Sequence, residues 1–287
     1  MLFRLYKNVI SHLKSLKEDM KINIFMISGA KPWKYGYLAY KERTIKEALN
    51  NEEILDSFLF SRKLSQKYGF RIDERVVEYP WFFSRIKNTE ALLLDAGSTL
   101  NHKYLLDQPI LKNRHIVIYS LSPEHTFRIP RVSYIYGDLR RTILKDEVFD
   151  EIICLSTLEH IGMDSTFLYT SDFRLKEANY NDYKAVVKEF KRILKPKGKL
   201  FITVPYGRYE NLGWQQQFDQ SRVNEVIESF QPSSSDISYF KYSKNGWQIA
   251  DAAECSDCSY YDIHKTKSYA KDYAAAARAV ACIELVK

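Results

Sequence analysis

The sequence has few cysteines, no long apolar run and no phosphate-binding loop. Its 287 residues include only 4 cysteines, scattered along the chain, which favours a reduced, cytoplasmic setting over a disulfide-stabilised secreted domain. No run of about 18 apolar residues occurs, so we expect no membrane-spanning helix, and the N-terminus lacks a signal-peptide pattern. The absence of G-x-x-x-x-G-K-[ST] argues against a P-loop nucleotide hydrolase.

Composition and charge are those of an ordinary globular protein with a basic surface. Hydrophobic residues make up 45% of the chain and charged residues 28%. The net charge of +7 favours anionic partners such as nucleotide sugars or acidic glycans, although lysines spread over solvated faces would give the same value. Nucleic acid is not favoured, because no aromatic residues interleave with the densest lysine cluster, in residues 184–199.

The first 88 residues predict a helical extension. Residues 1–20 carry apolar side chains at the 4-3-4-3-4 spacing of one helical stripe: Leu2, Tyr6, Val9, Leu13, Leu16 and Met20. This helix could pack on its own domain, pair with a second copy or lie on a membrane surface. Residues 21–27 predict a short strand, and 42–68 predict helix with a break near Asn50-Asn51. Pro80 predicts an extended conformation for Tyr79.

From residue 91 onward, strands alternate with helices. Apolar runs predict strands at 91–95, 115–120, 133–136, 148–155 and 199–205. Each gap leaves room for a crossover, so we expect a mainly parallel sheet with helices on both faces. Residues 208–250 are expected to be a substrate-side insertion, and 274–287 a helix end followed by a last strand.

Three blocks of sequence carry a family resemblance. They read LLLDAGSTLNH (92–102), VFDEIICLSTLEHIG (148–162) and VVKEFKRILKPKGKLFITVPYG (186–207). In this order they resemble the class I S-adenosylmethionine (SAM)-dependent methyltransferases. The resemblance implies a Rossmann-like α/β fold over residues 89–287, with a seven-stranded sheet whose last strand is antiparallel, and SAM as the cofactor.

Two departures from the family pattern concern the cofactor loops. The family usually has an acidic residue and three glycines after the first strand; this chain keeps Asp95 and Gly97 and lacks the other two glycines. SAM has no phosphate, so it places a weaker demand on that loop than a dinucleotide does. After the second strand, related enzymes usually have an acid that binds the ribose hydroxyls. Here Ser120 stands in its place, and Glu124 in the next turn could compensate.

The resemblance and the rule that ligands bind beyond the carboxyl ends of the strands together predict one crevice. The residues expected to bind the cofactor are Asp95, Ala96, Gly97, Ser98, Ser120, Leu121, Asp138, Leu139, Ser156 and Thr157. Asp138 fits an adenine contact or a plain helix cap equally well.

Candidate acid–base residues follow the fourth strand. His160 has an ordinary pKa near 6.5 and can accept a proton at neutral pH, and an alcohol attacking a methyl group must lose its proton. We therefore predict His160 or Glu159 as the base, although both could merely line the pocket. Cys255 and Cys258 form only one cysteine pair, so no metal site is expected.

The acceptor prediction is a sugar hydroxyl. Tyr79, Trp81, Tyr206 and Trp214 are expected at the crevice mouth, because aromatic faces suit sugar rings, although core packing is the commoner role. The pattern VEYPW…LDAGSTLNH…LSTLEHIG…VPYG also resembles methyltransferases of bacterial surface-polysaccharide synthesis. The sequence thus predicts a cytoplasmic O-methyltransferase acting on a sugar, nucleotide sugar or glycan, and it leaves open a peripheral association with the inner membrane. A small metabolite or a protein as acceptor, and a degenerate non-catalytic scaffold, stay open as alternatives.

Overall fold

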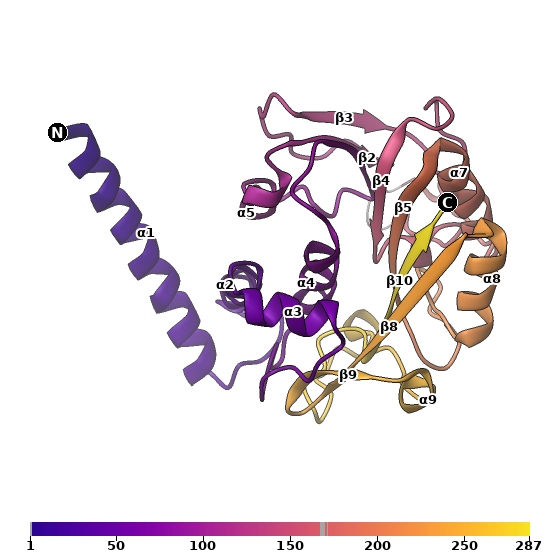
Figure 1. The fold of residues 1–287 in the computed structure, drawn as a ribbon. Helices are drawn as coiled ribbons and strands as arrows, with labels where there is room; N and C mark the ends of the chain where they lie inside the picture. The colour runs from indigo at the N-terminus through magenta and orange to yellow at the C-terminus, as the bar shows by residue number, and fades with distance from the viewer. Residues whose placement is uncertain (1, 167–169, 171) are drawn as a thin grey trace.

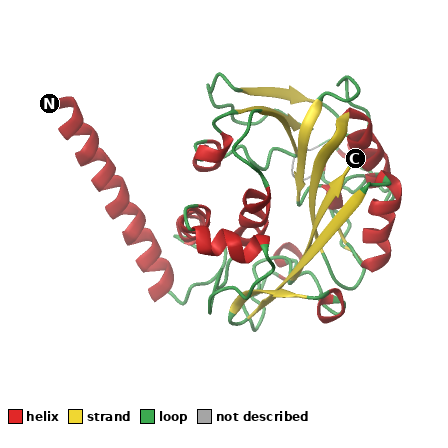
Figure 2. Cartoon of the chain, viewed as in Figure 1, coloured by secondary structure: helices red, strands yellow, loops and turns green. Residues whose placement is uncertain are grey.

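The computed structural model describes residues 2–166, 170 and 172–287, and its centre is an eight-stranded sheet. The strand order is β3-β2-β1-β4-β5-β10-β8-β9 (Figures 1 and 2). The strands are β1 (Ala91–Ala96), β2 (Arg114–Ser120), β3 (Val132–Tyr136), β4 (Phe149–Leu155), β5 (Leu194–Pro205), β8 (Ser234–Ser243), β9 (Gly246–Ala250) and β10 (Ala279–Val286). Strands β1 to β5 pair in parallel, and β10 is antiparallel to both β5 and β8. The predicted Rossmann-like methyltransferase fold and its antiparallel last strand are confirmed.

Helices cover both faces of the sheet (Figure 1). The longer helices of the chain are α1 (Leu2–Ile27), which extends away from the sheet, α2 (Tyr37–Leu49), α3 (Glu52–Leu59), α4 (Arg75–Arg85), α7 (Tyr183–Ile193) and α8 (Gln220–Phe230). The short ones are α5 (Lys103–Leu106), η1 (Pro109–Leu111), η2 (Leu158–His160), η3 (Phe173–Leu175), α9 (Ala252–Cys255) and α10 (Ile263–Thr266), and a small hairpin pairs β6 (Glu210–Asn211) with β7 (Gln216–Gln217).

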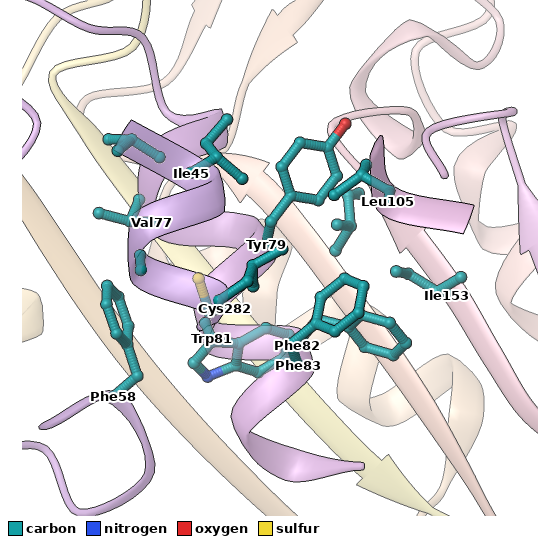
Figure 3. Packing of buried hydrophobic residues seen from close by; sticks show 14 of the residues in the cluster. Ile45, Phe58, Val77, Tyr79, Trp81, Phe82, Phe83, Leu105, Ile153 and Cys282 are labelled. Carbon is teal, nitrogen blue, oxygen red and sulfur yellow. The ribbon is translucent and has the colours of Figure 1, made fainter. Parts of the chain in front are cut away.

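The helices of the N-terminal segment share a core with the sheet rather than standing apart from it. Trp81 and Phe82 of α4 pack edge-on against Phe201 of β5, with ring centroids 5.9 and 5.2 Å apart. Figure 3 shows Trp81 and Phe82 on α4 within the buried cluster. Phe58 of α3 packs against Phe240 of β8 at 5.2 Å. Burial of such large side chains is the main stabilising contribution here, at roughly 1.5–3 kcal/mol each.

Helix α4 overturns the prediction of an extended segment before Pro80. Proline has no N–H, so the carbonyl of Val76 cannot receive its usual helical hydrogen bond; the hydroxyl of Tyr68 donates to it instead, at 2.8 Å. The preference of Tyr79 for an extended backbone is outweighed because the helix buries Val76, Val77, Trp81, Phe82 and Phe83 together.

The first helix is longer than predicted. Residues 21–27 continue α1 instead of forming a strand, because Phe25 is buried against Tyr37 and Tyr40 of α2.

The predicted helix break at Asn50-Asn51 is confirmed. The Asn51 side chain caps α3 by accepting a hydrogen bond from the Ile54 N–H at 3.1 Å. The helix predicted to continue to residue 68 ends with α3, because residues 60–68 are not helical. Among the described residues no helix has the length and apolarity needed to cross a bilayer.

The sheet has eight strands rather than seven. The segment 208–250, predicted as an insertion, supplies β8 and β9, which extend the sheet beyond β10. The strand of alternating polar and aromatic residues at 234–243 was missed because its first half is exposed. Residues 274–277 are buried but not helical, so the predicted helix end there is wrong.

Candidate active site

A cavity of about 650 Å³ opens beyond the carboxyl ends of the parallel strands. Its walls include Gly97 after β1, Ser120 at the end of β2, Asp138 after β3 and Ser156 after β4. These strands are neighbours on either side of the point where the strand order reverses, which is where open α/β sheets bind ligands. The volume falls within the range of about 300–1,000 Å³ usual for small-molecule sites.

Most predicted cofactor residues line this cavity. Those on its wall are Gly97, Ser120, Leu121, Asp138, Leu139, Ser156 and Thr157. Asp95, Ala96 and Ser98 are buried behind it. The carboxylate of Asp95 accepts hydrogen bonds from the backbone N–H groups of Thr99 and Leu100 at 3.0 and 2.8 Å. Asp95 therefore shapes the loop from inside, and burial raises its pKa to about 6.

Gly97, in the loop after β1, lies against Thr157, in the loop after β4. Its φ is +109°, and a Cβ built there would lie 2.1 Å from the Thr157 hydroxyl oxygen. Only glycine combines that backbone conformation with that contact. The next residue, Ser98, also has positive φ, at +61°, so the loop makes its turn without the second family glycine.

An acidic residue lies at the end of β2 despite the serine found there. The Glu124 carboxylate accepts from the Ser120 hydroxyl at 2.9 Å and from the Ser98 hydroxyl at 2.7 Å. Glu124 thus brings a carboxylate to Ser120 from the following turn. The sequence suggested that Glu124 could compensate for Ser120, but it could not show where the Glu124 carboxylate lies.

Asp138 lines the cavity but is held by a cation. Arg140 binds its carboxylate at 2.6 Å and also binds Glu177 and Asp182 at 2.5 and 2.6 Å. Burial opposes ionisation of Asp138, but the hydrogen bonds from Arg140 outweigh it and lower its pKa. Arg140 therefore joins the loop after β3 to the segment that precedes α7, and Leu175 and Glu177 of that segment wall the cavity.

The structure separates the two acid–base candidates. His160 lines the cavity, whereas Glu159 is 2% exposed and is not on its wall. Burial raises the pKa of Glu159 well above its ordinary value, which favours the neutral form of its carboxyl. The His160 Nδ1 lies 3.2 Å from the carbonyl oxygen of Trp214, and burial lowers the pKa of the imidazole to about 4.

The bond to Trp214 fixes the tautomer of His160. A carbonyl oxygen can only accept, so Nδ1 carries the proton and Nε2 has the free lone pair. Among the described residues no side chain bonds to Nε2. The ring is thus a neutral proton acceptor in the cavity wall.

Three of the four aromatic residues predicted at the crevice mouth lie in the core instead. Tyr79, Trp81 and Tyr206 are 0–2% exposed, because α4 turns its aromatic face toward the sheet and Tyr206 follows the buried strand β5. Trp214 differs: its ring lies 5.2 Å from that of His160, and Tyr260 packs on its other side at 6.2 Å. Spacing along the sequence could not show which aromatic residues face the crevice.

Sequence reasoning missed Arg75, which lines the cavity from α4. The segment was expected to be extended, so no signal placed this side chain at the strand ends. Among the described residues no cluster of three or more His, Cys, Asp or Glu could hold a metal ion.

The fold is the Rossmann-like methyltransferase fold, with a cavity beyond the carboxyl ends of its parallel strands. Residues 96–202 match the family model described as a methyltransferase domain, and SAM is the cofactor indicated for such a domain with a Rossmann-like fold. Among curated protein sequences, none matches the chain.

Three solved structures are given as examples of those with a similar fold. A SAM-dependent methyltransferase from Archaeoglobus fulgidus is 12% identical, covers 80% of this chain and 99% of its own, and has a TM-score of 0.47. The 1,6-didemethyltoxoflavin N1-methyltransferase of Burkholderia thailandensis, solved with S-adenosylhomocysteine, is 14% identical over 69% and 72% with a TM-score of 0.42. A Haloferax volcanii putative methyltransferase in complex with the Trm112 activator is 14% identical over 70% and 84% with a TM-score of 0.41.

Proposed function

We propose that the protein transfers the methyl group of SAM to a hydroxyl of a sugar, nucleotide sugar or glycan. The observation that carries this proposal is the orientation of His160, whose Nδ1–H donates to the Trp214 carbonyl and whose Nε2 is left as an acceptor. A hydroxyl must lose a proton as it forms the new C–O bond, and a positioned neutral imidazole can take it.

The residues around the cavity fit the cofactor. When bound, SAM supplies a sulfonium methyl group that a nucleophile can accept. Gly97 and Thr157 bring the loops after β1 and β4 together at the cavity wall, and Ser120, supported by Glu124, offers hydrogen bonds for ribose hydroxyls. Leu121 and Leu139 add apolar surface for a flat base. Holding both reactants in line is the main contribution expected of such a site.

The neighbourhood of His160 supports a ring-shaped acceptor. The partly exposed Trp214 ring lies beside the imidazole, and the partly exposed Tyr260 ring packs against Trp214; aromatic faces pack on the apolar faces of sugars. The Trp214 indole N–H donates to Asp262 at 3.2 Å, which fixes the orientation of that ring. No feature of the described residues specifically favours a small metabolite or a protein hydroxyl as the acceptor.

An acceptor panel tests the proposal. The purified full chain is incubated with SAM and separate monosaccharides, nucleotide sugars and lipid-linked sugars, and S-adenosylhomocysteine release is measured. We expect at least one sugar to raise the rate above the no-acceptor background, with the product methylated on oxygen by mass spectrometry. Background rates with every sugar, together with a clear rate on amine or carboxylate compounds, would contradict the sugar assignment.

We further propose that helix α1 associates with an anionic membrane surface. Leu13, Leu16, Met20, Ile24 and Ile27 are 43–87% exposed and form one stripe, whereas Glu18 and Asp19 beside it are paired with Arg43. Lys17 and Lys21 border the stripe and are exposed. An exposed apolar stripe with a basic border suits the surface of an acidic bilayer, and α1 extends away from the body of the protein (Figure 1).

Vesicle sedimentation tests the role of α1. We expect the full chain to sediment with vesicles containing phosphatidylglycerol and less with phosphatidylcholine alone, and L16E/M20E to lose this binding while SAM binding is unchanged. As a control, Leu59→Glu changes an exposed apolar residue on α3 and should retain vesicle binding. If L16E/M20E instead converts a dimer to a monomer and vesicles bind neither protein, the stripe is a self-association surface and the membrane proposal is wrong.

A further inference from the structure

We propose that Arg75 binds the carboxylate of the cofactor, so that the segment before the methyltransferase domain completes the cofactor site. Arg75 is the first residue of α4, outside the matched range 96–202, and it lines the same cavity as Gly97 and Thr157. The inference rests on SAM as cofactor and is independent of which acceptor is methylated.

The guanidinium of Arg75 is anchored through one nitrogen only. Its Nη1 donates to the Glu78 carboxylate at 2.8 Å and to the Leu155 carbonyl at 3.2 Å. Within the described part of the chain, Nε and Nη2 make no hydrogen bond or ion pair. Arginine presents donors in a planar fork that suits a carboxylate, so the unused donors can receive one without loss of the anchor.

Glu78 is committed to holding this arginine. Its side chain is 0% exposed, and its other oxygen accepts from the hydroxyls of Ser156 at 2.5 Å and Thr203 at 2.6 Å. These bonds tie α4 to the ends of β4 and β5, and they fix the position of the guanidinium at the cavity wall before any ligand arrives. A charge held in place in this way costs little reorganisation on binding.

The charges of the cofactor decide which part of it faces Arg75. SAM carries two positive groups, its sulfonium and its ammonium, and one negative group, its carboxylate; adenine and ribose are neutral. Like charges brought together in a partly buried cavity repel strongly. The other charged residues of the wall, Asp138, Arg140 and Glu177, are paired with one another. Arg75 is therefore the cation available to the carboxylate, on the side of the cavity formed by Gly97 and Thr157.

A pair of ligands isolates this contact. S-adenosylhomocysteine has the amino acid portion, whereas 5′-methylthioadenosine has the same nucleoside and sulfur without it. By titration calorimetry, Arg75→Gln should weaken S-adenosylhomocysteine binding by about ten- to a hundredfold, the usual loss for a hydrogen bond to a charged group. The affinity for 5′-methylthioadenosine should stay within about twofold, which also shows that the pocket is intact.

Three further variants control for charge and folding. Arg62→Gln removes an exposed arginine that is not on the cavity wall and should change neither affinity. Arg75→Gln leaves Glu78 buried without its cation, so R75Q/E78Q provides a neutral pair that should fold and still show the selective loss. Arg75→Lys should retain part of the affinity.

Two results would overturn the inference. Equal losses for both ligands in R75Q and R75Q/E78Q would assign Arg75 to the shape of the pocket, and unchanged binding of S-adenosylhomocysteine would place the carboxylate elsewhere. Failure of the wild-type protein to bind either ligand would instead contradict the cofactor assignment itself, a different outcome from both.

Discussion

Replacement of Gly97 by alanine is expected to abolish cofactor binding. The new methyl group would lie within 2.8 Å of three Thr157 side-chain atoms, and φ of +109° is strained for any residue with a Cβ. Strain and overpacking together should lower the free energy of unfolding by roughly 2–5 kcal/mol. The first and fourth loops would separate, so S-adenosylhomocysteine affinity should fall by far more than the stability change alone predicts. Calorimetric titration and thermal unfolding measure the two effects.

Gly29→Ala is the matched control for this prediction. Gly29 has a similar φ of +92°, but nothing lies within 4 Å of the position its Cβ would take, and it does not line the cavity. This variant should show the backbone strain alone, about 1–2 kcal/mol, with cofactor affinity unchanged. Equal stability losses in the two variants, with binding retained in G97A, would show that the contact with Thr157 does not organise the site.

The positions of the parallel strands along the chain were predictable because a buried parallel strand has a local sequence pattern. Residues 92–94 of β1 and 152–155 of β4 are uninterrupted apolar runs, as expected of strands covered on both faces, and polar residues follow each run. That regularity, together with the family resemblance, predicted that Gly97, Ser120, Asp138 and Thr157 share one crevice. The eighth strand lacked such a run, because half of β8 is exposed.

Helix α4 shows what local rules could not predict. The residue before proline prefers an extended backbone, and that preference is worth less than the burial of five large apolar side chains against the sheet. With the helix misassigned, Arg75 could not be placed at the cavity, and Tyr79 and Trp81 were assigned to it instead. The bond from Thr203 to Glu78 spans 125 residues, a pairing that no sequence window contains.

The sequence could not predict the tautomer of His160, because that tautomer depends on a hydrogen bond to Trp214, 54 residues away. The sequence predicted a titratable group with an ordinary pKa near 6.5. In the structure, burial lowers that pKa to about 4, and the Trp214 carbonyl selects the tautomer. The expected pH dependence therefore changes, and this change is measurable.

Replacement of His160 by alanine is expected to reduce kcat by about 10²- to 10⁴-fold, the usual contribution of a general base, on the acceptor identified from the sugar panel. Cofactor affinity should change little. Because burial holds the imidazole neutral, the wild-type kcat/KM should be flat between about pH 5.5 and 8 and fall only as pH approaches 4. A histidine with an ordinary pKa would already lose half its activity near pH 6.5.

Nuclear magnetic resonance of the ¹⁵N-labelled imidazole checks the same geometry without an acceptor. We expect the signals of a neutral ring protonated at Nδ1 from pH 8 down to about 5, with S-adenosylhomocysteine bound or absent. His115, on β2 and exposed, is the internal control and its substitution by alanine should leave kcat unchanged. A ring protonated at Nε2, or a loss of activity in H160A matched by an equal loss of cofactor affinity, would assign His160 to the pocket wall and leave the reaction without this base.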